Sequence, residues 1–181
     1  MQTIGQSTRD PLDPFLLTRL IILLQTLNHW LHIVSSAAWI GGIYYFLFVS
    51  APAVHALTPK PALDVLNRAR RHFQILTWVA ISLLLLTGLL KFLLTGIPSG
   101  GGYRGISVVK LFLFLAMIFH HCLQSFKYSP RITLLTAQTQ PEITAWTEPL
   151  QNHWKRWFVL HKINAALGPI VLLLGLALSR S

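Results

Sequence analysis

Four long apolar runs, separated by shorter polar stretches, dominate the pattern of hydrophobic and polar positions. No Lys, Arg, Asp or Glu occurs between Arg19 and Lys60, and charge-free runs recur at 72–90, 111–126 and 163–179. A helix that crosses a hydrocarbon core needs about 20 apolar residues. With their flanks, the runs predict transmembrane helices at about 30–54, 72–94, 105–126 and 158–178. Because backbone groups in lipid must bond internally, we expect an all-α, polytopic membrane protein built as a four-helix bundle.

The residues before the first span form a separate stretch of the pattern. We expect residues 1–29 to be a polar or interfacial segment and residues 30–181 to be one transmembrane domain. Between 15 and 27 the apolar positions 16, 20, 24 and 27 share one side of a helix, which predicts an amphipathic interfacial helix or an extension of the first span. No charged region leads into a short apolar run with a cleavage site, so a cleaved signal peptide is not expected.

Composition and charge place the chain in a membrane. Hydrophobic residues make up 53% of it and charged residues only 11%, with a formal net charge of +10. The basic residues gather in two predicted loops, 57–71 and 127–157, without the interleaved aromatics of a nucleic-acid surface. The positive-inside rule predicts that both loops are cytoplasmic and both termini outside, in the inner (plasma) membrane. Cys122 is the only cysteine, which excludes an internal disulfide and a cysteine-rich zinc site.

Polar residues inside the predicted spans are the candidates for a functional site, because unpaired polar groups are costly in lipid. In the first span His32, Ser36 and Trp39 follow a helical stripe, and His29 lies one turn before His32. In the third span a stripe from Lys110 to His121 favours His121 over His120 as the inward histidine. The fourth span presents a narrow face of polar and small residues: His161, Asn164, Ala165, Gly168 and Gly175.

Histidines that enter a bundle from facing helices commonly hold a haem or a metal ion. We therefore interpret His32, Lys110, His121, His161 and Asn164 as candidate cofactor-binding residues, and His32, His29 and His121 as candidate metal ligands. The plainer interpretation stands beside this one. A histidine near a span end is often only an interfacial polar residue, and a lysine there can extend its ammonium to the headgroups.

Several short motifs resemble the CopD family of copper-resistance membrane proteins. They occur in the family's order: Leu31-His32-Ile33, Trp39-Ile40-Gly41-Gly42, Ala51-Pro52, Arg70-Arg71-His72-Phe73, Thr87-Gly88-Leu89 and Val109-Lys110-Leu111. The resemblance covers about residues 30–126 and implies a protein that binds or passes copper at the inner membrane. Met1 and Met117 are the only methionines, so a methionine-lined copper path is not available and the ligands must be histidines.

The same scaffold is also similar to the HemJ family of haem-binding membrane proteins, which is linked to protoporphyrinogen oxidation. His32 with Trp39, Lys110 with His121, and Asn164 match that family's pattern. Ala165 and Ala166 stand where that family typically has a glutamate, and no carboxylate lies in any predicted span.

Three functions follow from these patterns. The first is a CopD-like protein with a copper ion at His32. The second is a HemJ-type oxidoreductase that binds haem b, and the third is a non-catalytic membrane assembly subunit. For so small a bundle we expect a homo-oligomer, or a soluble metal-delivery partner, to complete any path across the bilayer. The sequence does not decide whether the protein is an enzyme.

Overall fold

The computed structural model describes residues 14–96 and 101–179, and within these ranges every regular element is helical. The four long helical stretches Phe15–Ala56, Pro59–Leu94, Gly102–Ala137 and Glu148–Leu178 are long and apolar enough to cross a membrane. The all-α, four-span prediction is therefore confirmed. The elements along the chain are α1 (Pro14–Tyr45), the π-helical turn η1 (Phe46–Ser50), α2 (Ala51–Ala53), the 3₁₀ turn η2 (Val54–Ala56), α3 (Pro59–Thr95), α4 (Gly101–Cys122), the π-helical turn η3 (Leu123–Tyr128), α5 (Ser129–Ala137) and α6 (Glu148–Ser179).

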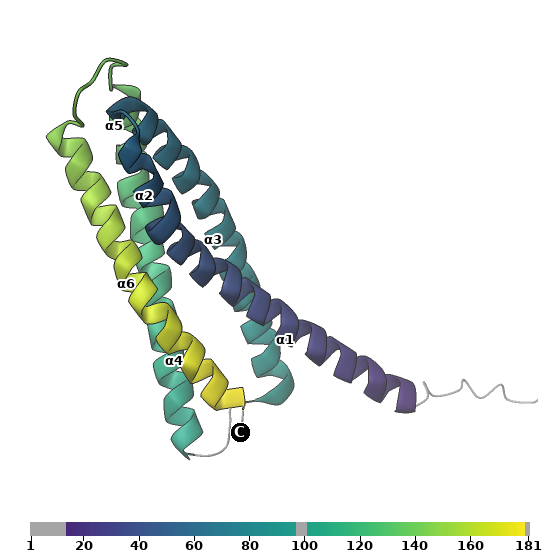
Figure 1. Ribbon diagram of the computed structural model, residues 1–181. Coiled ribbons are helices and arrows are strands. Elements are labelled where there is room, and N and C mark those ends of the chain that lie inside the picture. Colours follow the sequence, from purple (N-terminus) through teal and green to yellow (C-terminus); the bar gives the residue numbers. More distant parts are fainter. Residues whose placement is uncertain (1–13, 97–100, 180–181) are drawn as a thin grey trace, which may run out of the picture.

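The first helix begins well before the predicted first span. Helix α1 runs unbroken from Pro14 to Tyr45, so residues 15–27 extend the span, which is one of the two alternatives that the pattern allowed. No Pro or Gly interrupts the chain between 15 and 40, and nothing therefore ends the helix there. Figure 1 shows the N-terminal part of α1 leaving the bundle at an angle, and its apolar side chains are exposed. The polar start expected at residues 1–13 lies outside the described residues.

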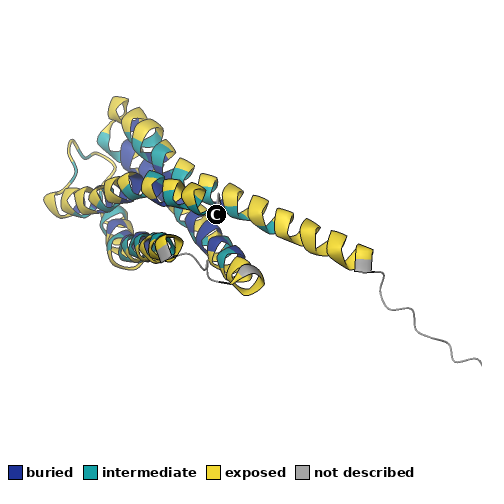
Figure 2. Ribbon diagram, turned by 90° about the horizontal axis from the view of Figure 1, so that it is seen from below, coloured by how far each residue is buried: buried dark blue, intermediate teal, exposed yellow. Residues whose placement is uncertain are grey.

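The helices pack as two antiparallel pairs, α1 with α3 and α4 with α6. Close approach depends on glycines. A Cβ added at Gly42 would lie 3.1 Å from the Phe73 ring on α3, and one at Gly168 would lie 3.2 Å from Ile40 on α1. The hydroxyl of Tyr44 also joins the pairs, donating to the carbonyl of Ala165 at 2.8 Å. Figure 2 shows buried residues on the facing sides of the helices and exposed residues on the outer sides, as expected for a bundle surrounded by lipid.

The two predicted basic loops are mostly helical, and the loop boundaries drawn from the sequence were wrong. Helix α3 already begins at Pro59, and α5 continues the third span to Ala137, so the loop at this end shrinks to about residues 138–147. Pro59 and Pro130, which fall inside the predicted loops, occupy first helical turns, where the missing N–H is not needed.

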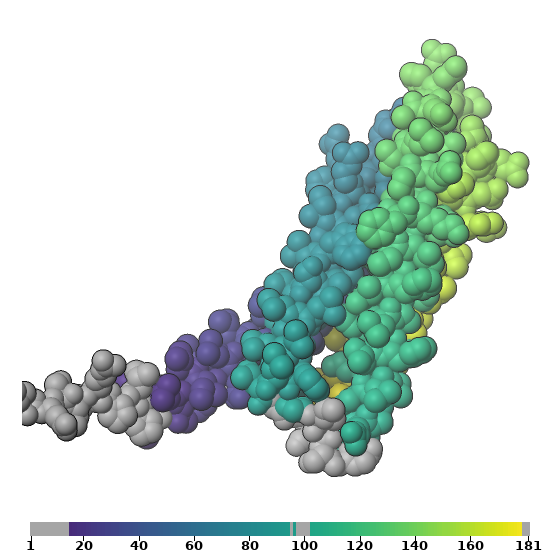
Figure 3. Space-filling model, turned by 180° about the vertical axis from the view of Figure 1, so that it is seen from behind, coloured from purple at the N-terminus to yellow at the C-terminus, as the bar shows by residue number. Residues whose placement is uncertain are grey.

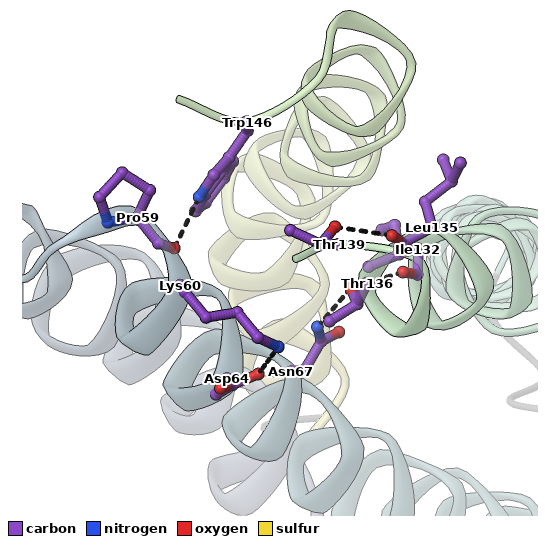
Figure 4. Close-up of polar contacts among 9 residues, drawn as sticks. All are labelled: Pro59, Lys60, Asp64, Asn67, Ile132, Leu135, Thr136, Thr139 and Trp146. Atoms are coloured by element: carbon purple, nitrogen blue, oxygen red, sulfur yellow. Dashed lines mark hydrogen bonds and ion pairs between the residues drawn. The ribbon is translucent and has the colours of Figure 1, made fainter. Parts of the chain in front are cut away.

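Hydrogen bonds close this end of the bundle, which we call the basic end (Figure 4). Asn67 on α3 donates to the Thr136 hydroxyl on α5 at 2.7 Å, and the Trp146 indole donates to the Pro59 carbonyl at 2.8 Å. Arg70 is only 3% exposed, and its guanidinium bonds to the neutral oxygens of Asn67, Gln74 and Thr133. No carboxylate in the described ranges pairs with it.

The opposite end, where α3 ends and α4 begins, is less tightly packed, and we call it the open end. The two helix pairs separate there (Figure 1). Figure 3 shows the surface hollowed between the last part of α3 and the first part of α4, with the end of α6 behind the opening. Residues 97–100, which contain the predicted Pro98 turn between the second and third spans, lie outside the described residues.

Candidate functional site

His32 on α1 is held by a hydrogen bond to α3 near the open end. Its Nδ1 lies 2.7 Å from the Thr87 hydroxyl, and that hydroxyl donates its single proton to the Leu83 carbonyl at 2.6 Å. Thr87 must therefore accept, and His32 Nδ1 must carry the donated proton. A neutral ring with Nδ1–H keeps its lone pair on Nε2, which is the arrangement of histidines that ligate metals. Asn28 supports the same contact by donating to the Thr87 carbonyl at 3.0 Å.

Two lysines lie near this histidine. Lys91 follows Thr87 by one turn of α3, and both Lys91 and Lys110 of α4 lie within electrostatic range of the His32 ring. The Lys110 ammonium rests against α6, 3.1 Å from where a Cβ at Gly175 would lie. It has no hydrogen-bond or ion-pair partner in the described part of the chain. We call His32, Thr87, Lys91 and Lys110 the His32 cluster.

The small-residue face predicted on the fourth span explains why Lys110 lies where it does. Gly175 leaves room for the lysine stem beside α6, so the ammonium can enter the space between the two helix pairs. Its position is therefore set by packing between α4 and α6, and not only by the tendency of a lysine to reach the headgroups. All four members of the His32 cluster come from helices that flank the open end.

A second group of polar residues lies deeper in the bundle. His121 and His161 are each 1% exposed and are surrounded by aromatic rings. The His161 ring stacks on Trp157 with centroids 4.1 Å apart, and the His121 ring meets Trp78 edge-on at 5.1 Å. Phe73 contacts both histidines. We call His121, Gln124, Trp157 and His161 the His161 cluster.

Gln124 determines how the His161 ring is used. With its amide as placed, the Gln124 nitrogen donates to the Trp157 carbonyl at 3.1 Å and to His161 Nδ1 at 2.6 Å. His161 Nδ1 is then an acceptor, and the proton of the neutral ring is on Nε2, which is buried and has no partner. His161 therefore presents an N–H and no free lone pair, the reverse of His32.

The two clusters lie at different levels of the bundle. Thr87 follows Trp78 by about two and a half turns of α3, or about 14 Å along the helix axis. The candidate metal ligands His32 and His121, which contact these two residues, are therefore not brought together. No group of three His, Cys, Asp or Glu side chains within residues 14–96 and 101–179 is arranged to hold a metal ion. His29, the third candidate, is largely exposed.

Asn164 and His120 belong to neither cluster. Asn164 on α6 donates to the Met117 carbonyl at 3.2 Å and accepts from His120 Nδ1 at 2.9 Å, so it joins α6 to α4. The sequence placed only His121 toward the interior. His121 does lie inside, but the His120 ring also reaches a partner across the helix interface.

Gln124 and Trp157 were not among the residues singled out from the sequence. Gln124 continues the stripe of Met117 and His121 at helical spacing, and a polar residue on that face is a signal that could have found it. Trp157 falls at the end of the predicted loop 127–157. It is 0% exposed, because α6 begins at Glu148, ten residues before the predicted fourth span.

Comparison with known proteins identifies the domain and not its chemistry. Neither the curated proteins nor the solved structures contain a match to the chain. A family model described as "Domain of unknown function (DUF4149)" matches residues 34–141, from the middle of α1 to the loop before α6. This match is to neither of the two families that the motifs resemble. Because it spans more than half of the 181 residues, the chain belongs to the DUF4149 family.

Proposed function

We propose that the His32 cluster binds haem b, and that His32 would hold the iron through Nε2. The observation that carries this proposal is the hydrogen bond from His32 Nδ1 to Thr87, which leaves the lone pair on Nε2. A fixed partner on the second ring nitrogen is the usual companion of a ligating histidine. Lys110 and Lys91 would pair with the two carboxylates of the porphyrin. When bound, haem b would supply a one-electron redox centre.

The charge around His32 favours this cofactor over a bare copper ion. Two ammonium groups lie within electrostatic range of the ring, and the spans contain no carboxylate apart from those at the basic end. A cation bound within about 8 Å of one lysine is repelled by about 2 kcal/mol at an effective dielectric constant of about 20. The two lysines therefore oppose a free metal cation, whereas they attract the carboxylates of a haem.

The geometry agrees better with one histidine ligand to the iron than with two. His32 and His121 differ in depth by about 14 Å along the bundle, so one iron cannot bind both. His161 carries its proton on Nε2 and gives that proton no acceptor among the described side chains. The roles in this proposal are thus ligation by His32, orientation of its ring by Thr87, and charge pairing by the lysines.

Copper is the second candidate, and one observation favours it. His29 lies one turn before His32 on α1 and within electrostatic range of it, so two imidazoles are available to one ion. Two histidines suit Cu(I) in a low-coordinate site, although the neighbouring lysines oppose it. CopD-like binding or passage of copper is the function that this arrangement would serve.

A visible spectrum with metal analysis separates these proposals. The full chain, produced with haem available and purified in detergent, should show a Soret band that shifts on reduction. His32→Ala should lose the band, whereas the matched control His55→Ala, an exposed histidine at the basic end, should keep it. Stoichiometric copper without a Soret band would replace haem by the second candidate. Absence of both would contradict both and leave a non-catalytic assembly subunit.

Two further variants test the assigned roles. Thr87→Val removes the partner of His32 Nδ1 and should weaken haem binding by roughly 10- to 100-fold. Lys110→Met should weaken it as well, whereas Lys162→Met, an exposed lysine on α6, should not. Retention of full affinity in Lys110→Met would remove that lysine from the site. Loss of the band in His161→Ala with His32→Ala unaffected would move the iron to the deeper cluster.

A further inference from the structure

A cavity lies at the basic end, which is the opposite end of the bundle from the His32 cluster. It is a groove of about 810 Å³ between the end of the first helical stretch and the beginning of α3. Phe46 and Phe73 form part of its lining, and Arg68 and His72 lie at its polar side. This volume lies in the range of cavities that hold small amphiphilic molecules.

The groove follows from a local irregularity of the first helix. The π-helical turn η1 spans Phe46–Ser50, and three of its residues, Phe46, Val49 and Ser50, line the groove. A π turn widens the helix by one residue and is often found at functional sites. Gly42, one turn before η1, brings the first helix against Phe73 and so sets the narrow end of the groove.

The polar side of the groove carries an unneutralised positive charge. Arg68 is exposed, and its guanidinium makes no hydrogen bond or ion pair with a described residue. His72 donates from Nδ1 to the Arg68 carbonyl at 2.9 Å, which leaves the lone pair of the neutral ring on Nε2, where it can accept a hydrogen bond from a headgroup hydroxyl. Asp64 is the one carboxylate in the lining, and Lys60 pairs with it at 2.9 Å (Figure 4). The ion pair cancels its charge and leaves that of Arg68.

Apart from Tyr45 and Ser50, the rest of the lining is apolar, and it includes side chains on the outer surface of the bundle. Val49 and Leu76 are 49% and 43% exposed, and both lie in the apolar part of their spans. Phe46 and Phe73 are buried beneath them. A ligand in this groove therefore contacts apolar side chains along one part of the groove and the Arg68 guanidinium at its polar side. A soluble anion would contact only the guanidinium.

We infer that this groove binds an anionic glycerophospholipid, with its phosphate at Arg68 and an acyl chain along Phe46, Val49 and Phe73. Guanidinium and phosphate form strong charge-assisted pairs. The groove lies where two spans reach the basic end of the bundle, which is the depth of lipid headgroups. The inference does not depend on haem or copper, because no residue of the His32 cluster lines the groove.

Binding can be tested on the full chain in neutral detergent. Phosphatidylglycerol and phosphatidylcholine with identical acyl chains are added at equal amounts, and bound lipid is counted by native mass spectrometry while thermal unfolding is followed. We expect phosphatidylglycerol to bind roughly tenfold more tightly, because both lipids carry the phosphate but the choline cation of phosphatidylcholine is repelled by Arg68. Equal binding of the two lipids would overturn the proposal. Equal protection by inorganic phosphate alone would overturn the lipid part of it.

Matched variants localise the effect. Arg68→Gln should remove most of the preference for phosphatidylglycerol, whereas Arg131→Gln, another exposed arginine of the basic end, should preserve it. Val49→Trp should fill the groove and displace the lipid, whereas Val108→Trp, a 65% exposed valine of α4 outside the groove, should not. If Arg131→Gln loses the preference for phosphatidylglycerol and Arg68→Gln keeps it, the lipid binds elsewhere. Because all four positions are exposed, the variants are expected to fold.

Discussion

Two threonines of α3 allow the environment of His32 to be tested by the same substitution at two positions. Thr87 accepts the hydrogen bond from His32 Nδ1, whereas the Thr77 hydroxyl is buried and has no hydrogen-bond partner among residues 14–96 and 101–179. Both are buried, with 2% and 0% of their surface exposed. Valine keeps the β-branched shape and removes only the hydroxyl. The two Thr→Val variants should therefore change stability in opposite directions.

The magnitudes follow from the hydrogen bonds. Thr87→Val deprives the His32 N–H of its acceptor, and interhelical bonds of this kind contribute about 0.6 kcal/mol on average and up to about 1.7 kcal/mol in membranes. Thr77→Val removes an unsatisfied buried hydroxyl and should stabilise by about 1 kcal/mol. The separation between the two variants is thus about 2 kcal/mol. The free energy of unfolding in mixed micelles, measured without added cofactor, gives this difference directly.

Two results would refute this reasoning. If Thr87→Val does not lower the free energy of unfolding, the bond between His32 and Thr87 does not form in the folded protein. If Thr77→Val destabilises as much as Thr87→Val, the Thr77 hydroxyl has an acceptor such as a buried water. In the first case the assignment of the free lone pair to His32 Nε2 would lose its support as well.

Three other predictions concern packing, a buried charge and topology. Gly42→Ala should destabilise by about 1 kcal/mol, because its Cβ would lie 3.1 Å from a Phe73 ring that is itself packed, whereas Gly41→Ala meets nothing within 4 Å and should be neutral or slightly stabilising in thermal unfolding. Asn67→Leu should cost about 3 kcal/mol by leaving the Arg70 guanidinium short of acceptors, whereas Arg70→Met should be close to neutral, and chemical unfolding compares the two. A reporter fused after the last residue should be active only outside the cytoplasm, and a cytoplasmic signal would contradict the orientation expected from the basic loops.

The sequence predicted the spans well because lipid imposes a simple rule on them. Every centre of the four predicted spans lies within a long helix, since uninterrupted apolar runs in lipid must form helices. The helix ends were predicted less well. Pro59 and Pro130 fall inside the two predicted loops, and a proline in the first turn of a helix has the same local sequence signature as one in a loop. Only the packing of α5 against α3 and α6 separates the two cases.

The candidate residues were recognised singly, but their grouping was not. Helical periodicity places His32 and Lys110 on inward faces, yet it does not state how far each helix slides along its neighbour. That register puts Thr87 opposite His32 and Gly175 beside Lys110. It also separates His121 from His32, which the sequence had combined as metal ligands. The sequence of one helix predicts which residues share its inward face, whereas a site shared by two helices also depends on how the helices are aligned with each other.

The two histidine clusters differ in a way that bears on where a ligand would bind. At His32 a hydroxyl on α3 accepts the hydrogen bond from Nδ1, and two ammonium groups lie within electrostatic range of the ring. At His161 an amide occupies Nδ1, and the Nε2 proton is enclosed by rings. A buried N–H without an acceptor costs about 1–3 kcal/mol, which a single trapped water would relieve more easily than a metal ion, because a metal needs the lone pair. The deeper His161 cluster is therefore better suited to a structural contact between α4 and α6 that encloses one water molecule than to metal binding. The His32 cluster, with a free lone pair on a fixed ring and ammonium groups within electrostatic range, is therefore the part of the bundle in which a bound cofactor would meet groups already arranged for it.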